Sequence, residues 1–92
     1  MSVTINSATY NPAEGKVNVS GTREGNVSVT LKVFKVVGDG LMQVASADVT
    51  GNGTTIDKAI MVTLDPNFSY QVHGLGGDKD PVTRPVLFPS VL

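Results

Sequence analysis

Apolar and polar residues alternate along this chain in short segments, each closed by glycine, proline, aspartate or asparagine. In residues 26–33 every second position is valine or leucine, and the positions between them are asparagine, serine, threonine and lysine. A period of two places the apolar side chains on one face of a β-strand. About seven such segments follow one another at intervals of roughly ten residues, which is typical of an antiparallel β-sandwich. No window longer than one turn has the period of a helix, so we expect an all-β fold.

Local irregularities in this alternation give further expectations. The apolar phase shifts by one residue near Ser7 and again near Ala45; a β-bulge would produce either shift, and a change of sheet is an alternative for the second. Gly38-Asp39-Gly40 predicts a tight hairpin. Gly21 is expected to end the second strand, and Lys58 interrupts the apolar phase of the fifth. The expected strands are 3–10, 16–20, 27–36, 41–49, 54–64, 70–74 and 86–88.

The composition excludes several classes of partner. The chain has 92 residues, a formal net charge of −1 and no cysteine, so one domain with a thin core and no disulfide is expected. Positive side chains are scattered, which leaves no basic stripe to follow a nucleic-acid backbone. No run reaches the ~18 apolar residues of a membrane helix. The N-terminal Met-Ser-Val-Thr-Ile lacks a secretory signal, so we expect cytosolic synthesis; removal of a leader is the alternative.

One segment combines the end of a strand, a turn bent by proline and the start of the next strand. It reads Leu-Asp-Pro-Asn-Phe-Ser-Tyr-Gln-Val over residues 64–72. It resembles the tyrosine corner of fibronectin type III domains and of many bacterial and phage immunoglobulin-like modules. In that family the tyrosine hydroxyl hydrogen-bonds to backbone a few residues upstream. The residues that carry the resemblance are Leu64, Pro66, Tyr70 and Val72.

The first hairpin, from Tyr10 to Gly21, is similar to the same family. The resemblance therefore implies a single antiparallel Greek-key β-sandwich, immunoglobulin-like or fibronectin type III-like, in residues 1–80. Residues 81–92 follow as a proline-rich apolar segment. The buried tryptophan and the cysteine pair of many family members are missing, which excludes an antibody-type domain.

Residues 81–92 are the first candidate for an interaction, because solvated tails are usually polar. Prolines at 81, 85 and 89 confine such a segment to an edge strand or an extended tail. Either the segment is the last strand, with Leu92 closing over the core, or it docks on a neighbouring subunit. Phe34 and Val36 interrupt the polar face of the third strand, so that end is covered on both faces or contacts a partner. The predicted partner-binding residues are Phe34, Val36, Val86, Leu87, Phe88, Val91 and Leu92.

No pattern of residues indicates catalysis, a cofactor or a zinc site. His73, the single histidine, lies by parity opposite the apolar face of its strand, and no serine sits in a nucleophile turn. Asp78 and Asp80 share a glycine-rich loop, where turn formation is a simpler role than calcium binding. Phe34 and Phe68 are the plausible exposed aromatic pair for stacking on a sugar. Asn-x-Ser/Thr sequons at 18, 26, 52 and 67 are expected to be coincidental.

These observations predict a non-enzymatic structural or binding module. The specific expectation is a small virion-surface accessory protein, such as a phage capsid decoration protein, assembled in bacterial cytoplasm. Its partner would be a major capsid protein, another assembly subunit or a second copy in a homo-oligomer. The alternative is an adhesin or carbohydrate-associated module of a larger secreted bacterial protein, located outside the cell or on its surface. This expectation rests on fold-level analogy.

Overall fold

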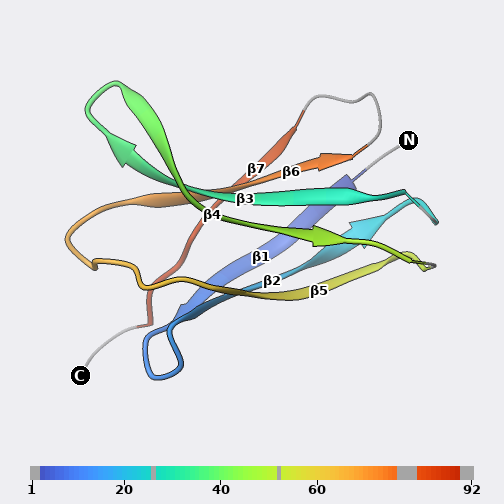
Figure 1. Ribbon diagram of the computed structural model, residues 1–92, viewed down its shortest axis with the longest axis horizontal. Coiled ribbons are helices and arrows are strands. Elements are labelled where there is room, and N and C mark those ends of the chain that lie inside the picture. The colour runs from blue at the N-terminus through green and yellow to red at the C-terminus, as the bar shows by residue number, and fades with distance from the viewer. Residues whose placement is uncertain (1–2, 26, 52, 77–80, 90–92) are drawn as a thin grey trace.

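Two antiparallel sheets pack around one core in the computed structural model of the chain, which describes residues 3–25, 27–51, 53–76 and 81–89 (Figure 1). One sheet has the strand order β1-β2-β5 and the other β4-β3-β6-β7. The described residues contain no helix, and therefore none that could cross a membrane. The all-β expectation is confirmed. The strands are β1 Val3–Asn11, β2 Lys16–Arg23, β3 Val29–Val37, β4 Gly40–Val49, β5 Thr55–Met61, β6 Tyr70–Gly76 and β7 Val82–Pro85.

The core consists of the inward positions of the alternating strands. Leu31, Val33 and Ile56 have no exposed surface, and they come from both sheets. Lys58 also sits at an inward position of β5, because it lies directly across from the buried Val19 of β2. Its side chain is half-buried at the edge of the sheet, which explains how a charge fits into an apolar series.

The bulge expected near Ser7 is present, since the pairing of β1 with β2 shifts between Ile5 and Ser7. Gly21 lies directly across from Ile5, beside this bulge. The expectation that Gly21 ends its strand is wrong, because β2 continues to Arg23. A Cβ at position 21 would collide with the carbonyl oxygen of Thr4. Glycine is therefore needed here because the backbones of β1 and β2 approach closely, and not because the strand ends.

The second phase shift is also a bulge. β4 stays in one sheet, and its register with β3 shifts where Val33 pairs with Ala45 and Phe34 with Gln43, which leaves Val44 as the extra residue. The predicted hairpin is present as well. Val37 pairs with Gly40, so Gly38, with a positive φ of 56°, and Asp39 form the turn.

The last strand is not where the sequence predicts it. β7 covers Val82–Pro85 and pairs with β6, whereas 86–88 contain no regular strand. An edge strand needs donors on one side only, so its prolines are tolerated. After Pro85 the chain crosses to the other sheet. There the Leu87 N–H donates to the Ala8 carbonyl, and the Leu87 carbonyl accepts from the Tyr10 N–H, both at 2.9 Å.

Two tyrosine hydroxyls hold the turn between β5 and β6. The Tyr70 hydroxyl accepts a hydrogen bond of 3.0 Å from the backbone N–H of Asp65, the bond that the corner sequence predicts. The Tyr10 hydroxyl accepts from the neighbouring Leu64 N–H at 3.2 Å, in a more buried position. Both tyrosine rings pack near Phe88, with centroid distances of 5.4 Å from Tyr10 and 6.0 Å from Tyr70. The corner therefore ties three parts of the chain together.

Candidate interaction surface

The C-terminal segment is largely part of the fold. Val86 is buried, and its N–H donates to the Tyr70 carbonyl at 2.9 Å. Phe88 is half-buried and packs on the core. Among the predicted residues of this segment that the structure describes, Leu87 has the most exposed side chain, at 59%. Val91 and Leu92 lie outside the described residues. Val86 therefore serves the core of this chain, and Phe88 gives part of its surface to the same core.

An apolar hollow of about 200 Å³ lies at the corner end of the sandwich. Its walls carry almost no free polar group: the Tyr10 hydroxyl already accepts from the Leu64 N–H. Ligand pockets are typically ~300–1,000 Å³ and contain a few polar groups that orient the ligand. This hollow meets neither condition. Its lining residues are Tyr10, Pro12, Leu64, Pro66, Phe88 and Pro89.

Phe34 and Val36 lie on the outer face of the four-stranded sheet, as the alternation predicts, and both are half-buried. Phe34 packs against His73 of β6 with a centroid distance of 4.5 Å. The His73 Nε2 is 3.1 Å from the Gln71 Oε1, also on this face. His73 thus contacts an aromatic ring and an amide, and this group contains no nucleophile or carboxylate.

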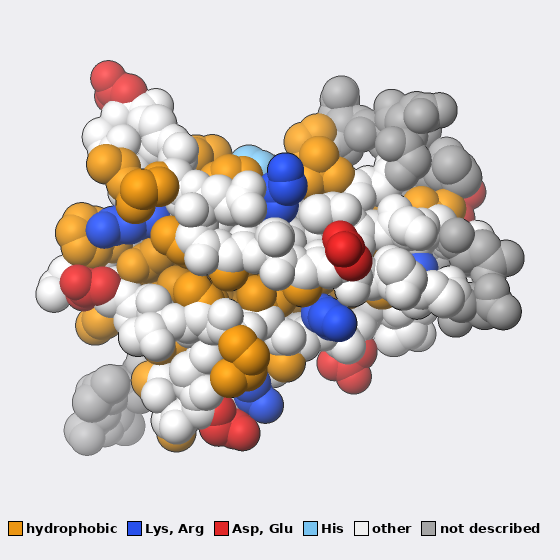
Figure 2. Space-filling model, viewed as in Figure 1, with side chains coloured by type: hydrophobic (Ala, Val, Ile, Leu, Met, Phe, Trp, Pro, Cys, Tyr) orange, Lys and Arg blue, Asp and Glu red, His pale blue; other side chains and the backbone are white. Residues whose placement is uncertain are grey.

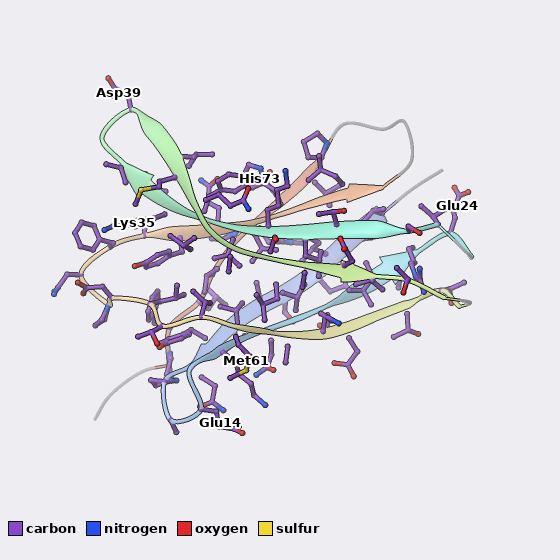
Figure 3. All side chains as sticks on the ribbon, viewed as in Figure 1. Glu14, Glu24, Lys35, Asp39, Met61 and His73 are labelled. Carbon is purple, nitrogen blue, oxygen red and sulfur yellow. The ribbon has the colours of Figure 1, made fainter. Side chains whose placement is uncertain are left out.

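Beyond Phe34 the hairpin of β3 and β4 extends past the rest of the sandwich, with Asp39 at its tip (Figures 1 and 3). Large apolar side chains gather on this end of the molecule (Figure 2). The loop between β5 and β6 lies beside the hairpin: the Lys35 Nζ is 3.6 Å from the centroid of the Phe68 ring. We call this set the hairpin surface; its members, with their exposed fractions, are Val37 (48%), Leu41 (46%), Met42 (50%), Val44 (36%) and Phe68 (43%).

The sheet edges differ in how they are protected. The edge of β1 is covered by Leu87 and by the Arg84 side chain, whose Nε donates to the Ile5 carbonyl at 2.7 Å. β7 is only four residues long and ends in Pro85. β5 carries the inward Lys58. Short strands, prolines and inward charges all discourage pairing with a further strand.

β4 has the least protected edge. It is ten residues long, contains no lysine, arginine or proline, and has Asp48 as its one charge. Its bulge at Val44 is the only protective device, and this interrupts the edge near its middle. Within the described ranges no strand pairs with the outer side of β4. Three of the five residues of the hairpin surface, Leu41, Met42 and Val44, therefore lie on the strand that has the free edge.

Other predicted sites are not assembled by the fold. The described residues contain no cluster of three or more potential metal ligands, and Asp78 and Asp80 lie outside them. The Asp65 carboxylate accepts a hydrogen bond of 2.9 Å from the backbone N–H of Asn67. Phe34 packs against His73, and the Lys35 ammonium lies over the Phe68 ring.

Sequence reasoning missed Arg23, which lies between the expected strands 16–20 and 27–36. Its guanidinium is buried and donates to the carbonyl of Val27 at 2.6 Å. It also donates to the carbonyl of Val49 at the end of β4 (3.5 Å) and to the carbonyls of Thr50 (3.3 Å) and Gly51 (3.2 Å) in the segment that follows. The signal was present in the alternation, because Arg23 continues the inward series of Val17, Val19 and Gly21. Its role is to hold two loops together.

A scan against protein-family models and searches among curated proteins and solved structures found no match to this chain.

Proposed function

We propose that this chain is a non-enzymatic binding module that docks through the β3–β4 hairpin. The observation that carries the proposal is the hairpin surface, five large apolar side chains that are each at least one third exposed. Isolated exposed apolar residues are common on proteins, but several on one projecting hairpin, beside a free strand edge, are typical of an interaction site. Phe34 and Val36, on the adjoining outer face, extend the same surface.

The finer fold and biological context are part of this proposal. The strand orders β1-β2-β5 and β4-β3-β6-β7 and the hydrogen bond from Asp65 to Tyr70 support a Greek-key, fibronectin type III-like sandwich. For a short module of this kind we propose an accessory role on a larger assembly, such as a virion surface. The apolar hairpin supports an assembly partner over a carbohydrate, because four of the five residues of the hairpin surface are aliphatic or methionine side chains, which offer no ring to stack on a sugar.

The docking site can be tested with a photo-reactive amino acid in place of Met42, in the cells that produce the protein. The matched control is the same amino acid in place of Met61, which is 70% exposed on β5, away from the hairpin (Figure 3). We expect one dominant cross-linked product from position 42, identified by mass spectrometry. Equal or absent cross-linking at the two positions would contradict the proposal.

A further inference from the structure

We propose that β4 pairs with β4 of a second copy of this chain, antiparallel about a two-fold axis at Met42. This inference rests on the proposed docking role of the hairpin and names the partner. Such a contact is isologous, because the same strand is presented by both copies. It would join two four-stranded sheets into one continuous sheet across the projecting hairpins.

The backbone groups free for this pairing follow from the register. The Val36 N–H donates to the Ser69 carbonyl at 2.9 Å, on the side of β3 away from β4. Because the backbone N–H and C=O groups of successive residues point to alternate sides of a strand, those of Lys35 point toward β4, where Met42 lies across from it. The N–H and C=O of Met42 therefore pair with β3. The N–H and C=O of its neighbours Leu41 and Gln43 point outward, to the free edge.

These free groups are placed symmetrically. A two-fold axis at Met42 brings Leu41 level with Gln43 of the second copy, and each such pair can exchange two hydrogen bonds, about four in all. The faces match as well, since Leu41 and Gln43 lie across from Val36 and Phe34 on the outer face of the sheet. Met42 meets Met42 of the second copy as a pair without hydrogen bonds, with Cα atoms about 4.5 Å apart.

The charges permit this arrangement. Asp39 is three residues from the axis, so the two Asp39 residues lie on the order of 20 Å apart, and the two Asp48 residues lie farther still. Repulsion at that separation is largely screened, because the Debye length is about 8–10 Å at ordinary ionic strength. The Lys35 ammonium lies over the Phe68 ring of its own chain. No like charges face each other at the centre of the pair.

The contact is small. The bulge at Val44 limits regular pairing to the hairpin half of β4, and the apolar part consists of the half-exposed side chains of the hairpin surface. Stable dimers typically bury ~800 Å² on each partner, and smaller contacts are weak or transient. The inference is therefore a reversible dimer whose population depends on concentration.

The test uses the absence of cysteine, since one introduced thiol is then the only one in the chain. In Met42→Cys the two thiols would face each other across the axis, at a Cα separation compatible with a disulfide. Met61→Cys is the matched control, another exposed methionine replaced on a strand. Under mild oxidation at equal concentration we expect Met42→Cys to form the disulfide dimer at least about tenfold faster, because pairing raises the effective thiol concentration.

Sedimentation equilibrium of the unmodified protein completes the test. We expect the mass to rise above the 9.6 kDa of one chain as concentration increases, and Met42→Lys to abolish the rise while leaving the circular dichroism spectrum unchanged. A monomer up to roughly 1 mM, a limit that corresponds to about −4.1 kcal/mol of binding, would overturn the inference. So would equal oxidation rates of the two cysteine variants. If position 42 photo-cross-links only to a different protein, self-pairing is overturned and the docking function stands.

Discussion

Replacing each corner tyrosine with phenylalanine should separate two hydrogen bonds that share one turn. The phenyl ring keeps the packing against Phe88, so the loss is confined to the hydroxyl and the N–H that it accepts from. An unsatisfied buried donor costs about 1–3 kcal/mol. The Leu64 N–H, bonded to Tyr10, is buried, whereas the Asp65 N–H, bonded to Tyr70, is only partly buried and can regain water.

We therefore expect a loss of about 2 kcal/mol in the free energy of unfolding for Tyr10→Phe and about 1 kcal/mol for Tyr70→Phe. Each kcal/mol corresponds to roughly 4–8 °C in Tm for a domain of this size. Urea unfolding followed by circular dichroism measures both, since tyrosine fluorescence would itself change. Thr63→Val, which removes an exposed hydroxyl beside the corner, is the control and should stay within about 0.5 kcal/mol. A larger loss for Tyr70→Phe than for Tyr10→Phe would refute the reasoning from burial, and no loss in either would refute the hydrogen bonds.

Four further substitutions test the fold by thermal unfolding. Gly21→Ala should cost about 1–3 kcal/mol, because its Cβ would force the Thr4 carbonyl to move; an unchanged Tm would contradict the close approach. Arg23→Met should cost about 2–3 kcal/mol through the loss of charged donors to buried carbonyls, and amide exchange should rise first in the segment between β4 and β5. Val86→Ser should cost at least about 1.5 kcal/mol and Leu87→Ser less than about 0.5 kcal/mol; equal losses would show that the C-terminal segment does not pack as described.

Much of the fold could be predicted because alternation reports directly on the burial of each face. The bulge near Ser7 was visible in this way, since the apolar series resumes at Ala8 on the opposite parity. Gly21 shows where such reading fails. A glycine in a strand pattern can mark the end of the strand or a close contact between two backbones. Which of the two applies to Gly21 depends on the bulge in the neighbouring strand β1, which lies far from it in the sequence.

The proposed interaction surface was predicted only in part. Phe34 and Val36 were recognised because they break the polar face of β3. Met42 and Val44 were read as ordinary strand residues, since their exposure depends on how far the hairpin extends past the sandwich. Val86 was assigned to a partner because its segment is apolar, but an apolar residue between two prolines can equally fill its own core. Sequence pattern identifies an apolar side chain without identifying what covers it.

The contact between the C-terminal segment and β1 has a consequence for synthesis. Arg84 bonds to Ile5 across 79 positions of sequence, and Leu87 closes the same edge. During translation β1 is made before the other strands of the sandwich, yet the groups that cover its edge are made after them. The edge of β1 therefore stays open while the rest of the sandwich is made, and the long loop that closes it is costly in chain entropy. Folding should complete only after release of the segment around Leu87 from the ribosome, and nascent chains stalled before that point should be the forms that chaperones bind and that aggregate.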